Sequence, residues 1–315
     1  MKKSVIALVV VVAAVGGLYF ANKKAEDAIK QQISQANQSY IELAAQGEMP
    51  LIALSYKDVS ANVLTSTYRI HDLAISLGEF GDIATVTEIV ATGVKPKQLA
   101  DKGSMTLTGL KAASAALQML PPNLSAFVQG LEVHGDYSYA YQQDGSLQFN
   151  QATHINDEFS LSYDVTLANM QQFWQYAKEV TAMPAEQQQA LTTSEDYPKQ
   201  MLEQLLTGAL SKGEVVLVNQ GFLQRLTQVA AENGQAADFQ TLQGIALITV
   251  SSAENMPAAI KESVISFINN PEKLVLNFSF AEPLKFSEME NGQLATKMNS
   301  PEDFIEFANL SLTAN

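Results

Sequence analysis

The chain begins with a run of eighteen residues, Ser4–Ala21, that contains no charged side chain. Paired lysines flank this run on both sides, the second pair being Lys23 and Lys24. A helix that crosses the hydrocarbon core of a bilayer needs about 20 predominantly apolar residues. The sequence therefore predicts a membrane anchor over residues 1–24, to which the rest of the chain is attached.

A cleaved secretory signal peptide is the alternative to an anchor. The apolar core of a signal peptide has about 7–15 residues and is followed by a cleavage site of small residues. The run here is longer, and the bulky side chains of Tyr19 and Phe20 occupy its end. A cut after Gly17 is compatible with the small residues that precede it. The length favours retention as a single-pass anchor, and cleavage stays open as the alternative.

The charges beside the anchor bear on its orientation. Lys2, Lys3 and the amino terminus favour a cytoplasmic start, whereas Lys23 and Lys24 act in the opposite direction. We expect the large domain, residues 47–315, outside the cytoplasm. The Met-Lys-Lys start is typical of a bacterial protein. The expected location is therefore the cell inner membrane, with the large domain in the periplasm.

The charge and the cysteine content exclude several classes of function. Of the 19 basic residues, four flank the anchor, so the remainder of the chain has 15 basic against 33 acidic residues, a net charge of about −18. Such a field repels phosphate backbones and anionic lipid headgroups, so we expect no nucleic-acid partner. The chain has no cysteine, which excludes disulfides, zinc–thiolate sites and thiol catalysis.

An amphipathic helix is predicted next to the anchor, over residues 25–46. Its apolar positions recur every three or four residues: Ile29, Ile33, Ala36, Tyr40 and Leu43. A coiled-coil stalk and a helix folded back on its own domain both fit this pattern. The pattern covers only about two heptads, which is too short to favour a stalk. We expect the folded-back helix, ended by Gly47 and Pro50.

Beyond this helix the period of the apolar residues changes to two, which indicates strands. The strands expected are Leu51–Tyr56, Tyr68–Leu77 and Asp82–Val90. A helical patch is expected over Leu110–Leu120. A second short helix, capped by Asn123, is expected to end at Gln129.

The clearest sheet signal is a three-stranded meander over Leu131–Leu167. Its apolar residues fall on one face: Leu131, Val133, Tyr137, Tyr139, Tyr141, Leu147, Phe149, Phe159, Leu161, Tyr163, Val165 and Leu167. Directly opposed residues share a face, so Tyr141 must oppose Leu147 rather than Gln148. That register needs a three-residue loop with Gly145 in the left-handed conformation.

The second half of the chain is predicted to be mainly helical. Apolar stripes indicate helices around Met170–Ala177, Met201–Ala209 and Phe222–Ala230, a fourth opened by Pro257, and a short final helix capped by Ser300. Between them, strands are expected at Glu214–Val218, Gly244–Val250 and Leu274–Phe280. The stretch Thr181–Lys199 is a loop or a weak helix. The pattern predicts an α+β fold: an N-terminal transmembrane helix, a curved antiparallel sheet, and amphipathic helices packed on one face of the sheet.

The strongest candidate for chemistry is a pair of histidines in the meander. The register inferred above places His134 opposite His154 on the polar face, with Glu132 and Asp136 beside His134. Opposed Cβ atoms lie about 4.5–5.5 Å apart, so two imidazoles could share a metal ion. A solvated polar face explains the same residues, and we favour that interpretation. We therefore assign no metal ligand.

Signatures of catalysis and of cofactor binding are absent from the sequence. There is no Gly-x-Ser-x-Gly motif and no phosphate-binding glycine loop. We expect neither an enzyme nor a cofactor, and we assign no catalytic residue. The tyrosine stripe of Tyr137, Tyr139, Tyr141 and Tyr163 could line a groove for an apolar ligand. More often such a stripe is core, or lies beneath packed helices.

Two segments resemble known families. The segment Leu54–Leu77, after an anchor and a polar helix, resembles the opening of the YdgA-like family of bacterial membrane proteins of unknown function. The segment Phe267–Phe286 is similar to parts of that family and, more distantly, of AsmA-like periplasmic proteins. The long helical second half departs from the extended sheet of AsmA-like proteins. The resemblance implies an anchored periplasmic domain with a role in the cell envelope or in lipid homeostasis, and it supplies no catalytic residues.

Two functions are therefore predicted. The first is a binding module that holds an apolar ligand, such as a lipid, between sheet and helices, which needs an apolar cavity of roughly a few hundred Å³. The second is a structural or assembly partner of an inner-membrane complex, which needs an exposed apolar patch. For the second, the patch would lie along Ile29–Leu43. The tyrosine stripe and the family resemblance favour the first.

Overall fold

The computed structural model describes residues 22–47, 49–62, 65–93, 98–192, 194, 196–235, 237–254, 256–290 and 300–315. The chain divides into two compact units, Met1–Asp136 and Tyr137–Asn315. The predicted anchor run Ser4–Ala21 lies outside the described residues. Within the described ranges, no helix is long and apolar enough to cross a membrane.

The first unit is a helix on an antiparallel sheet. Its strand order is β1–β3–β4–β5, with β2 also paired to β3 and the start of β6 beside β5. In chain order the elements are α2 (Asn22–Ala45), β1 (Ile52–Ser55), β2 (Asp58–Asn62), β3 (Thr67–Leu77), η1 (Gly78–Phe80), β4 (Asp82–Thr92), β5 (Lys102–Ala112), α3 (Ser114–Gln118), α4 (Pro122–Gln129) and β6 (Val133–Tyr141).

The predicted amphipathic helix forms and folds back on its own unit as α2. Its Ile29, Ile33 and Tyr40 are buried in one core with side chains of β1 to β4, among them Leu54 and Leu73. The helix ends at Ala45, and Gly47 follows with a left-handed φ of 72°. The folded-back helix is therefore confirmed for this segment, and its apolar stripe is used within the unit.

A side chain of α2 also completes the edge of the sheet. The Asn37 Oδ1 atom accepts from the Leu54 backbone N–H at 2.7 Å, and its Nδ2 atom donates to the Leu54 carbonyl at 2.9 Å. The amide thus replaces the neighbouring strand that β1 lacks on that side. Such a cap satisfies backbone groups that otherwise offer a template for another chain.

The second unit contains a longer antiparallel sheet. Its order is the end of β6, then β7–β8–β9–β10–β11. Its elements are β7 (Leu147–Ile155), β8 (Phe159–Ala168), α5 (Gln171–Ala182), α6 (Ala185–Thr192), α7 (Tyr197–Leu205), β9 (Ala209–Asn219), α8 (Phe222–Glu232), α9 (Phe239–Ser252), α10 (Ala258–Asn269), β10 (Lys273–Lys285), α11 (Phe286–Glu290), α13 (Pro301–Phe307) and β11 (Ser311–Ala314).

The hairpin between β6 and β7 has the predicted loop. The Gln142 N–H donates to the Ser146 carbonyl at 2.8 Å, which leaves residues 143–145 as the loop. Gly145 has a φ of 83°, in the left-handed region. A side chain at Gly145 would also collide with Gln171, because an added Cβ would lie 1.8 Å from its Nε2 atom. The three-residue turn inferred from the alternation of faces is confirmed.

Two elements of the prediction are wrong. Leu110–Leu120 is not one helix: β5 continues to Ala112, and only Ser114–Gln118 is helical. Gly244–Val250 is not a strand but the middle of α9, whose start Asp238 caps by accepting from the Thr241 N–H. A short run of apolar β-branched residues fits a strand and a packed helix equally, and only its flanks separate the two.

Two boundaries also need correction. Ala209, predicted as the end of a helical stripe, is the first residue of β9. Asn123 lies inside α4, whose N-cap is Pro121. The cap predicted at Ser300 is confirmed, because its side chain accepts from the Asp303 N–H and Asp303 accepts from the Ser300 N–H.

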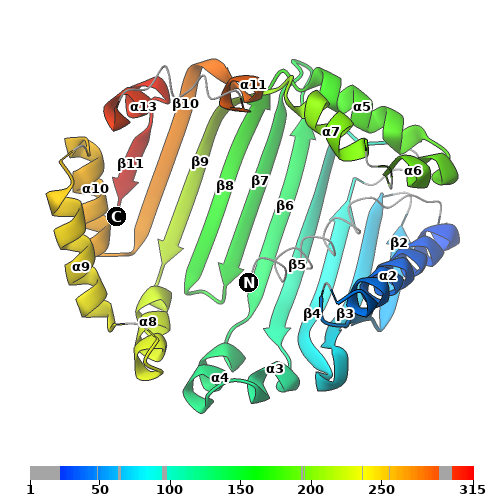
Figure 1. The fold of residues 1–315 in the computed structure, drawn as a ribbon, viewed down its shortest axis with the longest axis horizontal. Helices are drawn as coiled ribbons and strands as arrows, with labels where there is room; N and C mark the ends of the chain where they lie inside the picture. Colours follow the sequence, from blue (N-terminus) through cyan, green and yellow to red (C-terminus); the bar gives the residue numbers. More distant parts are fainter. Residues whose placement is uncertain are drawn as a thin grey trace. The chain divides into compact units, whose positions relative to one another are not determined.

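The prediction that helices pack on the sheet face holds for α2 and fails in the centre of the second unit. There, α5, α7 and α11 lie near one end of the strands and α8 near the other, while α10 lies along β11 (Figure 1). The middle of this sheet keeps an apolar face that these helices do not cover.

Candidate functional site

The candidate site is the apolar face of the sheet in the second unit, here called the open face. Antiparallel pairing places opposed residues on the same face. Pairs such as Leu161–Leu217, Tyr163–Val215 and Val215–Leu276 carry this face across β8, β9 and β10. Its members are Tyr137, Tyr139, Tyr141, Leu147, Phe149, Phe159, Leu161, Tyr163, Val165, Leu167, Val215, Leu217, Leu274, Leu276 and Phe278.

Burial distinguishes the centre of the open face from a closed core. Leu161, the third residue of β8, has 39% of its surface exposed. Its neighbours Tyr163, Val215 and Leu217 are half-buried. Isolated apolar side chains are common on protein surfaces, but a contiguous apolar patch marks an interaction site.

The opposite face is polar on β8, although Val216 of β9 pairs with Ser162 on that face. Ser160, Ser162 and Asp164 alternate with the apolar residues of β8. Asp164 accepts from Gln148 Nε2 of β7 at 2.7 Å. The two faces of β8 therefore differ in chemistry, although neither is covered as a core.

Aromatic side chains from two helices close the ends of the open face. Trp174 of α5 is only 5% exposed. It stacks on Tyr141 with ring centroids 4.9 Å apart and an angle of 8°, and it also contacts Tyr139 at 5.8 Å. At the other end Phe222 of α8 contacts Phe159 at 5.3 Å. The stretch between these contacts is the accessible part of the face.

The tyrosines of the open face report an apolar environment. Burial raises the pKa of the Tyr137 phenol to about 12, with smaller contributions from Tyr163 and Tyr139. The Tyr163 hydroxyl donates to the Gln151 Oε1 atom at 2.5 Å. The four tyrosines of the predicted stripe therefore have two environments. Tyr139 and Tyr141 lie beneath α5, whereas Tyr137 and Tyr163 belong to the half-buried stretch of the open face.

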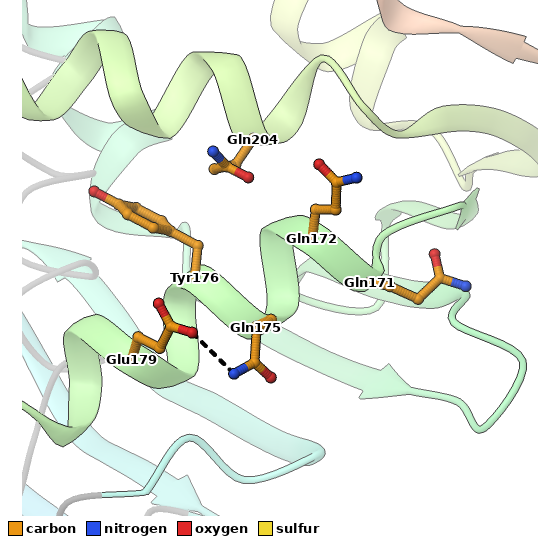
Figure 2. A pocket seen from close by; sticks show the side chains of 6 residues that line it. All are labelled: Gln171, Gln172, Gln175, Tyr176, Glu179 and Gln204. Carbon is orange, nitrogen blue, oxygen red and sulfur yellow. Dashed lines mark hydrogen bonds between the residues drawn. The ribbon is translucent and has the colours of Figure 1, made fainter.

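A pocket in the second unit has a different character. It lies between α5 and α7, has a volume of about 460 Å³ and is lined by Gln171, Gln172, Gln175, Tyr176, Glu179 and Gln204 (Figure 2). Gln175 donates to Glu179 at 3.0 Å, and Tyr176 donates to Gln200 at 3.1 Å. This lining is polar, so the pocket does not supply the apolar cavity expected for a ligand carrier.

The histidine pair gains no support as a metal site. His134 lies in the first unit, where its Nδ1 atom accepts from the Gly109 N–H at 3.3 Å and its Nε2 atom is 3.6 Å from the Glu132 carboxylate. His154 lies in the second unit, opposite Ser160. Across the described part of the chain, no group of three or more His, Cys, Asp or Glu side chains is placed to hold a metal ion.

Sequence reasoning found parts of the open face without joining them. The alternation of Leu274, Leu276 and Phe278 was recognised, but no local signal placed it beside the meander. The stacking of Trp174 on Tyr141 was also missed. In the sequence, Trp174 was only one member of a helical stripe.

Comparison with known proteins identifies a family whose description states no function. A family model described as "Uncharacterized protein" matches residues 152–315, which include most of the open face. A search of the curated proteins finds no match to the chain.

Proposed function

We propose that this chain, which belongs to the family of uncharacterized proteins matched over residues 152–315, is a non-enzymatic binding module for an apolar ligand. The ligand would lie with its hydrocarbon part on the open face. The observation that carries the proposal is the half-exposed apolar surface that runs over β6 to β10, closed at its ends by Trp174 and Phe222. A hydrocarbon chain on this surface would remove apolar area from water at roughly 25 cal/mol per Å².

The ligand class that fits is a lipid acyl chain. A long surface that is apolar on β8, β9 and β10, with the polar Gln151 and Thr153 of β7 beside Tyr163 and Leu161, suits an extended chain better than a compact ring system. The resemblance of Leu54–Leu77 and Phe267–Phe286 to YdgA-like and AsmA-like proteins supports a lipid in the bacterial envelope. The uncharged run Ser4–Ala21 supports an inner-membrane anchor with the binding domain in the periplasm.

The assembly role requires an exposed apolar patch, and the predicted patch is buried. Its apolar patch was expected along Ile29–Leu43, but Ile29, Ile33 and Tyr40 are buried against the first unit's own sheet. We therefore propose only the binding function.

The single tryptophan of the chain, Trp174, provides the test because it lies at one end of the open face. The full chain would be held in bilayer nanodiscs and titrated with a monoacyl phosphatidylcholine that carries bromine on its acyl chain, a quencher of tryptophan fluorescence. We expect saturable quenching. In Leu161→Asp the apparent affinity should fall at least about tenfold, because a carboxylate would face hydrocarbon.

Ser162→Asp is the matched control, since it adds the same charge at the next residue on the polar face. Its affinity should stay within about twofold of the parent value. Quenching that is absent, or equally weakened in both variants, would contradict binding at the open face. Circular dichroism of each variant would verify that the fold is retained.

A further inference from the structure

The pocket between α5 and α7 is built from two rows of side chains, one on each helix. Gln172 and Tyr176 lie four positions apart on α5, and therefore on the same side of that helix. Gln200 and Gln204 have the same spacing on α7. The helix α7 packs beside α5, and Figure 2 shows Gln172 and Tyr176 extending from α5 toward Gln204. The Tyr176 hydroxyl donates to the Gln200 Oε1 atom at 3.1 Å, so the two rows are bonded to each other at one end.

The amides that line this pocket differ in whether the protein already bonds them. The Gln175 Nε2 atom donates to the Glu179 carboxylate at 3.0 Å. The side-chain amides of Gln172 and Gln204, by contrast, have no hydrogen bond to any residue in the described part of the chain. Each of these amides offers two N–H donors and one carbonyl acceptor. Two helices therefore present hydrogen-bonding groups to the same pocket, and these groups are available to a ligand. The buried Trp174 holds α5 on the sheet at the same place.

The composition of the lining restricts the class of ligand. Of the described residues that line the pocket, none is Lys, Arg or His, so a phosphate or a carboxylate would meet no opposite charge and would be repelled by Glu179. A hard cation such as Ca²⁺ takes 6–8 oxygen ligands, whereas Glu179 is the one carboxylate of this lining and already accepts from Gln175. A hydrocarbon would desolvate the amides without replacing their hydrogen bonds. The lining therefore favours a neutral ligand that carries many hydroxyl groups.

We propose that the pocket between α5 and α7 binds a neutral saccharide. The Gln172 and Gln204 amides would bond ring hydroxyls from the two helices, each donating to one hydroxyl and accepting from another. The ring of Tyr176 is half-buried and held by Gln200, and the negative face of an aromatic ring attracts the C–H groups of a sugar. The volume of about 460 Å³ lies within the range of small-molecule sites.

Saturation-transfer difference NMR would test the proposal with the full chain in bilayer nanodiscs. The probe is N,N′-diacetylchitobiose, a neutral disaccharide with hydroxyl and amide groups, and we expect saturable transfer to its ring protons. Gln172→Ala and Gln204→Ala should each weaken the apparent affinity about three- to tenfold, because each removes one or two hydrogen bonds to the sugar. Gln228→Ala on α8 is the matched control, since that amide is also exposed, is bonded to Glu232 at 3.0 Å and does not line the pocket. The control should bind the disaccharide as the parent does.

Three outcomes would overturn the proposal. The first is transfer that does not saturate, and the second is an affinity that Gln228→Ala weakens as much as the pocket variants do. The third is equally tight binding of triglycine, which offers peptide amides without hydroxyls and would assign the pocket to a peptide. Gln204→Glu keeps the shape of the side chain but removes its Nε2 donor, so it should repeat the loss if the alanine variant does not fold. The proposal does not rest on ligand binding at the open face, because the two tests use different ligands and substitute different residues.

Discussion

The two units contain sheets of the same kind but use their apolar strand faces differently. In the first, α2 lies on the sheet, and core residues such as Leu54 and Leu73 are 7% and 2% exposed. In the second, the helices lie at the ends and along one edge of the strands, and Leu161 stays 39% exposed. The same alternation of apolar and polar residues therefore yields a closed core in one unit and an accessible surface in the other.

This difference shows that alternation determines which face is apolar but not whether that face is covered. Covering requires a helix with a long apolar stripe, and α2 supplies one from Ile29 to Tyr40. In the second unit, α5 and α8 each contribute one large aromatic residue to an end of the face. The accessible stretch is thus a consequence of where the helices are placed.

The largest difference in the free energy of unfolding is expected between two leucine-to-alanine substitutions, one in each unit. Leu73→Ala should lower the free energy of unfolding by about 2–5 kcal/mol, because it leaves a cavity in a closed core. Leu161→Ala should cost less than about 1 kcal/mol, since that side chain is already partly in water. Chemical denaturation followed by circular dichroism and by Trp174 fluorescence would measure both. Equal costs would mean that the open face is covered in solution, and the contrast between the units would be lost.

A smaller effect is expected at the edge of the first sheet. Asn37→Ala removes both hydrogen bonds to Leu54 and should cost about 1–3 kcal/mol, because the backbone groups of β1 lose their partner. Faster amide exchange at Leu54 would locate the change. Ser39→Ala, an exposed position on the same helix, controls for helix propensity. An Asn37→Ala variant as stable as this control would show that water replaces the amide without loss.

In the second unit a hydrogen bond from α10 caps the corresponding edge. The Ser263 hydroxyl of α10 donates to the Leu312 carbonyl of β11 at 2.6 Å. Ser263→Ala should therefore cost only about 0.5–1.5 kcal/mol. The same denaturation experiment would rank it against Asn37→Ala. A larger loss for Ser263→Ala would mean that α10 supports this edge mainly through that one hydroxyl.

Local signals in the sequence were sufficient for much of the fold. The helix stripe of α2, the alternation in β3 and β4, and the turn at Gly145 all depend on residues close together in the chain. The strand β5 was not predicted, and it contains Gly103 and Gly109, residues that weaken a local strand pattern. Gly109 in fact has a φ of 69°, and an added Cβ would lie 2.4 Å from the Thr87 hydroxyl. A contact with the neighbouring strand, invisible in the local pattern, requires that glycine.

The candidate site was less predictable because it is assembled over long distances in the chain. Tyr163 pairs with Val215, which pairs with Leu276, so three strands separated by whole helices share one surface. The misassigned α9 is a second example. Its run from Gly244 to Val250 has the apolar content of a buried element, yet Ile248 is the most exposed of the large apolar side chains described.

A further effect, which appears only at high pH, concerns the phenols of the two units. Burial raises the pKa of Tyr68 in the first core, and it raises that of Tyr137 on the open face to about 12. An unfolded chain loses the phenol proton near pH ~10. From about pH 10 to 12 the unfolded state has therefore lost a proton that folded Tyr137 retains, so stability falls as the pH rises. Tyr137→Phe should flatten this decline in denaturation experiments over that range.

The two phenols should respond differently to a bound acyl chain. A ligand on the open face excludes water from Tyr137 and should raise its pKa further, whereas Tyr68 is 2% exposed in a closed core and should not respond. Phenolate absorbance, titrated with and without monoacyl phosphatidylcholine in the parent protein and in Tyr137→Phe, would separate the two groups. A titration of Tyr137 that is indifferent to the ligand would place the ligand elsewhere. A shift that survives in Tyr137→Phe would instead implicate another phenol, because Tyr137 is then absent.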